Sequence, residues 1–248
     1  MNIAEKTLQL KQDFDEVYTA GKKSQYDEFW DAYQIGGARR NYIRAFSYCC
    51  FNKDNFKPKY PIVIIEGEFA FAYNATRHSH ASSAKNVMTD LIQVCKDNNV
   101  VIDTSQATNL SHLFYAGDWV TLPTISFESH NKAIQAAFYM NPNLVTIEKV
   151  IFKADGSNTF TKNSYDAPFT NCVNLRNIEI EGVIGDDFDI RHSAYLTKAS
   201  IESIVNALST TSNGKTVSFS KTAKQSAFTD SEWNALIATK PNWTFSLA

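Results

Sequence analysis

The chain has 248 residues, and its 24 Lys and Arg residues against 26 Asp and Glu residues give a formal net charge of −2 at pH 7. The sequence has no basic run of the kind that follows a phosphate backbone or an anionic lipid surface, which argues against nucleic acid and membrane surfaces as partners. A hydrophobic fraction of 44% is enough to bury a core, so we expect a folded chain.

The first 56 residues are predicted to form a helical hairpin. Apolar positions in residues 3–18 follow one helical stripe that Gly21 ends, and an aromatic-rich second helix begins near Ser24 and ends at Gly36 and Gly37. This hairpin exposes more aromatic surface than it can bury, so it either packs on the domain that follows or associates with copies of itself, and we expect an attachment or oligomerisation element. The polar start lacks the apolar segment of a secretory signal, and no stretch is apolar enough to cross a bilayer, so we expect neither Sec export nor membrane insertion.

Short strands and one helix are predicted for residues 57–195, after an extended connector at 52–61. The helix covers 82–95, where five apolar side chains share one face. Residues 153–166 are predicted to form a loop on one side. The strands are expected at 62–65, 100–102, 124–127, 147–152 and 177–181.

Residues 196–248 differ in pattern and are predicted to form a capping unit. The elements expected there are a helix at 197–208, a turn at Asn213-Gly214, a strand at 216–219, a helix at 230–239 and a strand at 243–247. A stack of repeats needs such a unit to cover its last hydrophobic face.

A coarse recurrence connects the middle of the chain. An Asn-Leu pair occurs at Asn109-Leu110, Asn143-Leu144 and Asn174-Leu175, with spacings of 34 and 31 residues between the leucines. Such a period is typical of stacked repeats, in which each unit contacts only its neighbours. We expect Phe114, Phe138 and Phe169 to wedge between consecutive turns. The predicted fold class is therefore α+β, an irregular repeat solenoid with an N-terminal hairpin and a C-terminal β-α-β cap.

The repeat segments resemble those of BspA-type leucine-rich-repeat proteins. The stretch 100–114, VVIDTSQATNLSHLF, is similar to the family pattern D-T-S-x-x-T-x-L-x-x-x-F, and Leu122-Pro123-Thr124-Ile125 is similar to its L-P-x-I continuation. Residues 169–178 resemble the common form F-x-x-C-x-x-L-x-x-I. The resemblance covers residues 62–195 and implies a leucine-rich-repeat solenoid. Trp119 and the irregular spacings depart from a regular array.

The two ends of the chain also carry a resemblance. Residues 17–31 and 228–244 are similar to sequences encoded in phage and prophage tail regions of Gram-positive gut bacteria. This implies a virion-associated or prophage-encoded protein, located in the virion or in the cytoplasm before release, whose repeats contact a host surface or another tail component. The resemblance implies no catalytic residues and assigns no ligand-contact positions.

Candidate metal and cofactor residues are few. His78 and His80 would project to one face of a strand, but a third ligand is not nearby, so a polar loop is the simpler interpretation. Asp186, Asp187 and Asp189 lack the ligand spacing of a calcium loop and are expected in an exposed turn. The sequence has no phosphate-binding glycine loop, and we expect neither a metal nor a cofactor.

Candidate catalytic residues are equally few. Ser111, His112 and Asp118 could form a hydrolase triad only without a nucleophile elbow, so we expect no catalytic site. His130 and His192, like His112, are expected to be surface or hydrogen-bonded structural residues. The four cysteines, Cys49, Cys50, Cys95 and Cys172, show no disulfide spacing and are expected to be reduced.

The sequence leaves open the role of three aromatic residues and supports three candidate functions. Tyr115, Trp119 and Tyr139 are either core residues or platforms for a sugar ring or a peptide. The leading hypothesis is a non-catalytic recognition or structural protein that binds a protein or a cell-surface glycan through a repeat surface. One alternative is a cell-wall or surface-glycan hydrolase, which needs paired carboxylates across a cleft. Another is a secreted bacterial adhesin at the cell surface, which the leaderless start does not favour.

Overall fold

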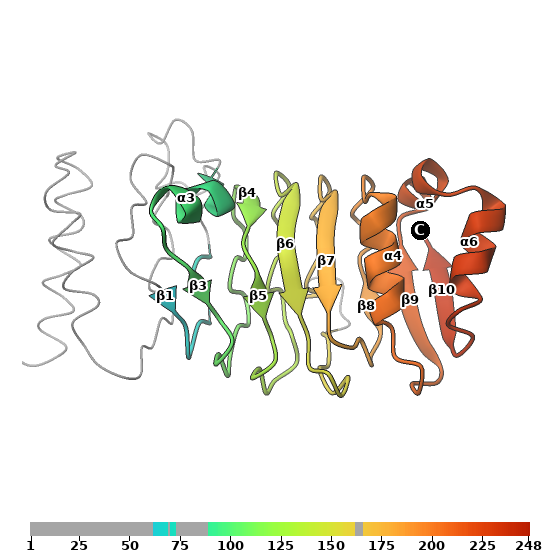
Figure 1. Cartoon of the computed structure of the whole chain (residues 1–248), viewed down its shortest axis with the longest axis horizontal. Helices are drawn as coiled ribbons and strands as arrows, with labels where there is room; N and C mark the ends of the chain where they lie inside the picture. Colours follow the sequence, from blue (N-terminus) through green and yellow to red (C-terminus); the bar gives the residue numbers. More distant parts are fainter. Residues whose placement is uncertain (1–61, 69, 73–88, 162–165) are drawn as a thin grey trace, which may run out of the picture.

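A computed structural model describes residues 62–68, 70–72, 89–161 and 166–248. The predicted hairpin in residues 1–56 and the pair His78 and His80 lie outside these ranges. The described part is a mixed α/β structure with three small parallel sheets, and its elements follow one another along one long axis (Figure 1). Within these ranges, no helix has both the length and the apolar character needed to cross a membrane.

Most predicted elements are present with shifted ends. The strand at 177–181 and the last strand agree in both bounds. The helix predicted at 82–95 instead begins at Leu91 and ends at Asp97, because Thr89 and Asp90 form a strand and Asp90 caps the helix. The strands are β1 (Ile62–Val63), β2 (Thr89–Asp90), β3 (Ile102–Asp103), β4 (Trp119–Leu122), β5 (Ile125–Ser126), β6 (Thr146–Ile151), β7 (Asn177–Glu181), β8 (Phe188–Asp189), β9 (Lys215–Phe219) and β10 (Trp243–Leu247). The helices are α3 (Leu91–Asp97), α4 (Lys198–Ala207), α5 (Lys221–Ala227) and α6 (Asp230–Ile237).

The central sheet is formed by consecutive segments that pair in parallel. β4 and β5 act as one strand interrupted at Pro123 and Thr124, and both halves pair with β6. Proline has no backbone N–H to donate to a sheet, which explains the interruption. β6 then pairs with β7, whose residues alternate between exposed and buried because successive side chains of a strand point to opposite faces.

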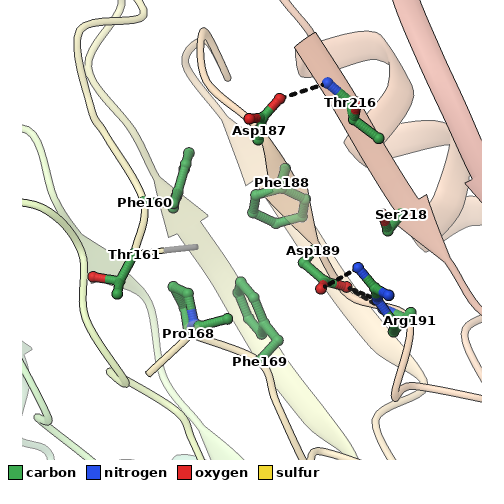
Figure 2. Close-up of a pocket in the computed structure, with 11 residues that line it drawn as sticks. Phe160, Thr161, Pro168, Phe169, Asp187, Phe188, Asp189, Arg191, Thr216 and Ser218 are labelled. Carbon is green, nitrogen blue, oxygen red and sulfur yellow. Dashed lines mark hydrogen bonds and ion pairs between the residues drawn. The ribbon is translucent and has the colours of Figure 1, made fainter. Parts of the chain in front are cut away.

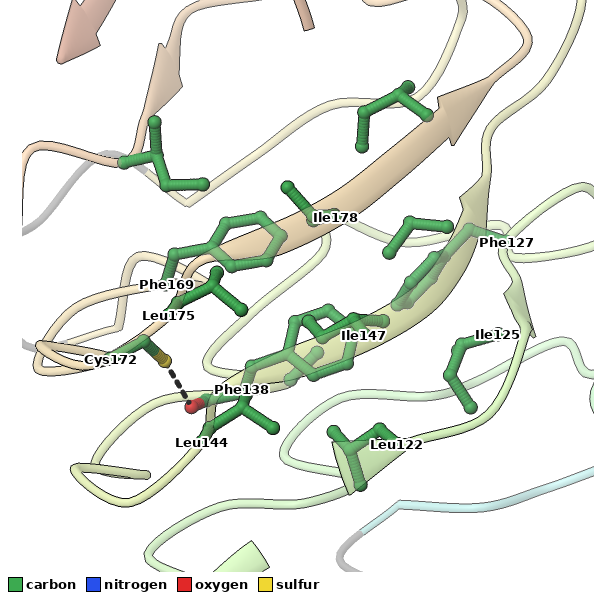
Figure 3. Close-up of a cluster of buried hydrophobic side chains, with 14 of the residues drawn as sticks. Leu122, Ile125, Phe127, Phe138, Leu144, Ile147, Phe169, Cys172, Leu175 and Ile178 are labelled. Carbon is green, nitrogen blue, oxygen red and sulfur yellow. Dashed lines mark hydrogen bonds between the residues drawn. The ribbon is translucent and has the colours of Figure 1, made fainter. Parts of the chain in front are cut away.

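A column of phenylalanine rings runs through the core, with one ring from each of four successive turns of the chain. Phe71, Phe114, Phe138 and Phe169 are buried, and the ring centroids of successive members lie 5.3, 6.3 and 5.1 Å apart with interplanar angles of 13°, 9° and 23°. Figure 3 shows Phe138 and Phe169 in adjacent turns. Backbone bonds accompany the rings, since Phe114 N–H donates to Ala137 O at 2.8 Å and Phe138 N–H to Pro168 O at 3.1 Å. Phe114, Phe138 and Phe169, which were singled out from the sequence, therefore stack on one another in the core.

The predicted Asn-Leu recurrence is in part misaligned. Leu144 and Leu175 do occupy equivalent buried positions (Figure 3), because each lies two residues before a paired residue of β6 or β7. The third member of this row is Trp119, because Thr121 of β4 pairs with Thr146 of β6. Leu110 instead lies in the turn that leads to Phe114. The spacing of paired residues is therefore 25 residues from Thr121 to Thr146 and 31 from Thr146 to Asn177.

Helix α4 covers the open edge of β7. In Figure 1 it follows β7 along the long axis, and the two elements are in contact. The backbone N–H groups of Ile178 and Ile180 donate to the hydroxyls of Ser200 and Ser203, each at 2.9 Å. Ser200 also donates to Arg176 O at 3.0 Å. Serine hydroxyls thus replace the carbonyls of a further strand and close this edge of the sheet.

We expect Ser200→Ala to destabilise the protein by about 1–3 kcal/mol, because it leaves the N–H of Ile178 unsatisfied in a buried position. Urea unfolding followed by circular dichroism measures this. Ser231→Ala, at an exposed position of α6, is the matched control and should stay within about 0.5 kcal/mol of the wild type. Equal unfolding midpoints for the two variants would contradict the capping role of Ser200.

The C-terminal unit contains three helices where two were predicted. β9 lies between β8 and β10, and both pairs are parallel. Thr229 and Glu232 form a capping box at the start of α6. The unpredicted helix α5 buries only Ala223 and Lys224, so its sequence has no apolar stripe that would have indicated a helix. Lys240 Nζ donates to the carbonyl oxygen of Asn206 at 2.9 Å and so holds the end of α4.

Candidate functional site

The outward side chains of β4, β6, β7 and α4 form a surface that we call the front face. Thr121, Thr146 and Asn177 lie in register on three successive strands of this face. Asn177 Nδ2 donates to Thr146 Oγ1 at 3.3 Å. Neighbouring strands are about 4.8 Å apart. The face therefore carries one polar side chain on each of three successive strands, on a frame held by backbone hydrogen bonds. At the β4 end, the Thr121 hydroxyl also accepts the backbone N–H of Ile92 at 3.1 Å.

Charged side chains lie beside this polar row. Two residues of β6, Glu148 and Lys149, stand opposite Glu179 of β7, because the register shifts between Ile147 and Val150. Lys149 Nζ lies 2.9 Å from Glu179 and 2.9 Å from Glu181. Hydrogen bonds to Glu181 and Glu179 raise the pKa of Lys149 above its ordinary value. The bulge thus places one ammonium group between two carboxylates.

An open groove separates β7 from α4 on the front face and has a volume of about 520 Å³. Glu179 stands on its β7 side and Glu202 on its α4 side. Within the part of the chain that the structure describes, no basic side chain lines this groove. Its lining residues are Glu179, Ile180, Gly182, Ala199, Glu202, Ser203, Asn206 and Ala207.

A second, smaller pocket of about 110 Å³ lies between the turn at Phe160 and the strands β8 and β9 (Figure 2). Its charged groups already have partners. Asp187 Oδ1 accepts the backbone N–H of Thr216 at 2.7 Å, and Asp189 forms an ion pair with Arg191 at 2.8 Å. The volume is well below the roughly 300 Å³ at which ligand sites begin. This pocket is therefore a packing feature between turns.

The prediction that Asp186, Asp187 and Asp189 lie in an exposed turn is wrong. Asp186 is only 8% exposed, Asp187 is half-buried, and Asp189 is half-buried in strand β8. The Asp186 carboxylate accepts the N–H of Phe160 at 3.3 Å and pairs with Lys215 at 2.7 Å. Asp186 therefore connects the segment at Phe160 with Lys215 at the start of strand β9. A buried carboxylate needs such partners, and here they come from segments that are distant in the sequence.

The residues considered for a catalytic triad contact neighbouring turns. Ser111 is buried, the ring of His112 packs against that of Tyr115 at 5.4 Å, and Asp118 Oδ1 accepts from Asn143 Nδ2 at 3.2 Å. Burial lowers the pKa of His112 below its ordinary value. These contacts belong to the packing of consecutive turns.

Accessibility decides the role of the aromatic residues. Trp119 is fully buried and Tyr139 is 8% exposed, so both are core residues, while Tyr115 is half-buried and stacks on Tyr139 at 5.3 Å. Among the described residues, the exposed aromatic one is Tyr195, with 54% of its surface accessible, which we did not single out from the sequence. The guanidinium of Arg176 lies 5.3 Å from the centre of its ring. No sequence signal distinguishes Tyr195 from the buried tyrosine, because exposure depends on the packing of turns.

Two cysteines lie in the described ranges, and both are free and buried as predicted. Burial, and to a smaller extent Glu148, raise the pKa of the Cys95 thiol to about 11. Burial raises the pKa of Cys172 to about 12, and its Sγ donates to Phe138 O at 3.0 Å. Thiols with a raised pKa are poor nucleophiles. Among the residues seen in the structure, no group of three or more His, Cys, Asp or Glu is arranged to hold a metal ion.

His130 is a hydrogen-bonded structural imidazole, as predicted. It is 1% exposed, and its Nδ1 accepts the backbone N–H of Leu110 at 3.1 Å. Nδ1 must be unprotonated to accept this bond. Burial, the largest cause, lowers the pKa of His130 below its ordinary value of 6.5.

We expect stability to fall as the pH is lowered from 7.5 to 5.5. Below about pH 6.5 the unfolded chain binds a proton at this position, while the folded state keeps His130 neutral until its lower pKa is reached. Urea unfolding at several pH values measures the effect. His130→Gln should unfold more easily but with a shallower pH dependence, whereas His192→Gln, at an exposed position, should keep the wild-type slope. A wild-type slope in His130→Gln would contradict the assignment.

Comparison of the chain with protein-family models, with curated proteins and with solved structures gives no match.

Proposed function

We propose that this chain is a non-catalytic recognition or structural protein of phage or prophage origin, in which an irregular leucine-rich-repeat solenoid presents its front face to a protein or a cell-surface glycan. The observation that carries the proposal is the register of Thr121, Thr146 and Asn177, which repeats one polar position on successive turns. Affinity then comes from several weak contacts across an extended surface.

The phenylalanine column supports the same proposal. Stacked rings and parallel backbone bonds join each turn to the next, so the outward side chains are held at a constant separation. A rigid surface loses little conformational entropy when it binds. The N-terminal segment would attach the protein or join copies of it.

The alternative, a glycan hydrolase, has one observation in its favour. Glu179 and Glu202 stand on opposite sides of the groove, as paired carboxylates of a glycosidase do. Glu179 is, however, held by Lys149 at 2.9 Å, and no aromatic side chain among the lining residues offers a surface for a sugar ring. We therefore favour binding. A zymogram against peptidoglycan and capsule tests this, and clearing that disappears in Glu202→Gln would overturn the non-catalytic proposal.

Binding through the front face is tested with the full chain on an array of cell-surface glycans and purified tail proteins. Asn177→Arg places a long charged side chain in the middle of the polar row, and we expect it to abolish binding. Thr222→Arg makes the same change on α5, at an exposed position away from the front face, and should leave binding unchanged. Equal loss in both variants, or loss in neither, would count against the front face.

A further inference from the structure

The turn that leads into β9 carries the one Asn-Gly pair of the chain, Asn213-Gly214, and both residues are exposed. The residues on either side of the pair are anchored. Ser212 Oγ and the backbone N–H of Thr216 donate hydrogen bonds to residues 185–187, at 3.1 and 2.7 Å. Within the ranges that the structure describes, neither the side-chain amide of Asn213 nor the backbone N–H of Gly214 has a hydrogen-bond partner. The tip of this turn is therefore free between two fixed ends.

An asparagine followed by glycine reacts with its own backbone when the glycine nitrogen is free. That nitrogen attacks the side-chain Cγ, so a new C–N bond forms and the bond from Cγ to the amide nitrogen breaks. The amide nitrogen leaves as ammonia, and it takes up through solvent the proton that the glycine nitrogen has lost. Water then opens the resulting succinimide ring at either carbonyl, which gives aspartate or isoaspartate. The sequence of steps consumes only water and is neither an oxidation nor a reduction.

Gly214 leaves room for this ring. Its φ is +65°, and nothing lies within 4 Å of a Cβ atom built there. Glycine also lets the backbone rotate into the attacking conformation at little cost. We propose that Asn213 is a deamidation site of the folded protein. The reaction adds one carboxylate to a chain of formal net charge −2 and places it two residues before Lys215.

The Asp-Gly pair at Asp155-Gly156 has a related sequence but is held by hydrogen bonds. The backbone N–H of Gly156 donates to Lys153 O at 3.1 Å, and Asp155 Oδ1 accepts the backbone N–H of Ser157 at 2.9 Å. Ring closure in this turn would break both bonds, and each has to be replaced before the nitrogen can attack. The fold therefore protects this pair and leaves the pair before β9 open.

The test uses the full chain kept folded in alkaline buffer, with peptide mapping by mass spectrometry to follow the conversion of amide to acid. Asp155→Asn places a second Asn-Gly pair in the protected turn of the same molecule, and circular dichroism checks that this variant is folded. We expect Asn213 to convert about tenfold faster than that second pair, because the second pair must first give up two hydrogen bonds. In concentrated urea, where neither turn exists, the two pairs should convert at similar rates.

The wild type provides an independent measurement. We expect Asn213 to convert at similar rates in buffer and in urea, and aged folded protein to elute later from an anion-exchange column as the new carboxylate appears. A rate at Asn213 that is tenfold lower in buffer than in urea would show that the fold protects this residue, and would overturn the proposal even if the Asp155→Asn variant does not fold. Equal rates at the two pairs in the folded variant would overturn it as well, because hydrogen bonding in the turns would then not select the site.

Discussion

Phe138→Ala is expected to lower the free energy of unfolding by about 3–5 kcal/mol, the range found when a buried phenylalanine is truncated in a core. Phe138 is fully buried between Phe114 and Phe169 and also contacts the edge of Phe127 at 6.2 Å. Removing its ring opens a cavity in the column and separates two turns. Since small domains are stable by only about 5–15 kcal/mol, this one change removes a large share of the total.

Urea unfolding followed by intrinsic fluorescence measures this loss. Val101→Ala is the control, because Val101 is 61% exposed and its truncation leaves no cavity. We expect that control to stay within about 0.5 kcal/mol of the wild type. A Phe138→Ala protein that unfolds together with the control would show that the ring column does not stabilise the stack.

Gly182→Ala is expected to have an effect of similar size for a different reason. Gly182 follows β7 with a φ of +85°, and a Cβ atom there would lie 2.1 Å from the carbonyl oxygen of Phe152. That contact is with backbone, so it is relieved only by moving the turn after β7 away from the turn after β6. Phe152 N–H donates to Glu181 O at 2.9 Å, and this movement would break the bond. We expect a loss of about 3–5 kcal/mol from backbone strain, overpacking and the lost bond together.

Gly214→Ala separates the steric cause from the conformational one. Gly214 also has a positive φ, +65°, but nothing lies within 4 Å of a Cβ atom built there. We expect this variant to lose only about 1 kcal/mol, the cost of placing alanine in a left-handed conformation. Thermal unfolding of the two variants and the wild type checks both values. A Gly182→Ala protein as stable as Gly214→Ala would mean that the turns are not in close contact at this position.

Elements with a clear hydrophobic period could be predicted from the sequence. The alternation in residues 177–181 predicted β7, and the apolar stripe at 197–208 predicted α4, because each pattern matches the geometry of one element. Helix α5 has no stripe and was missed. Leu110 was placed in the wrong row, because an Asn-Leu pair occurs both in a turn and before a strand and the sequence does not distinguish the two positions.

The candidate site was less predictable than the fold. Glu179 and Glu202 lie 23 positions apart in the sequence, and only the packing of α4 against β7 brings them to one groove. No sequence signal marks Ser200 and Ser203 as hydrogen-bond acceptors for the edge of β7. Their hydroxyls accept the N–H groups of β7 only because α4 packs beside that strand. Composition alone allows both Trp119 and Tyr195 to be either buried or exposed. The packing of the chain buries Trp119 and exposes Tyr195.

The sequence by itself determined which segments become strands or helices and which side chains are apolar enough to be buried, because these properties depend on local periodicity. The tertiary structure decided which residues share a row, which carboxylates face one another and which aromatic residues reach solvent. The physical reason is that parallel pairing joins residues 25 or 31 positions apart, and that register is set by backbone hydrogen bonds and ring packing between turns, which no local pattern specifies.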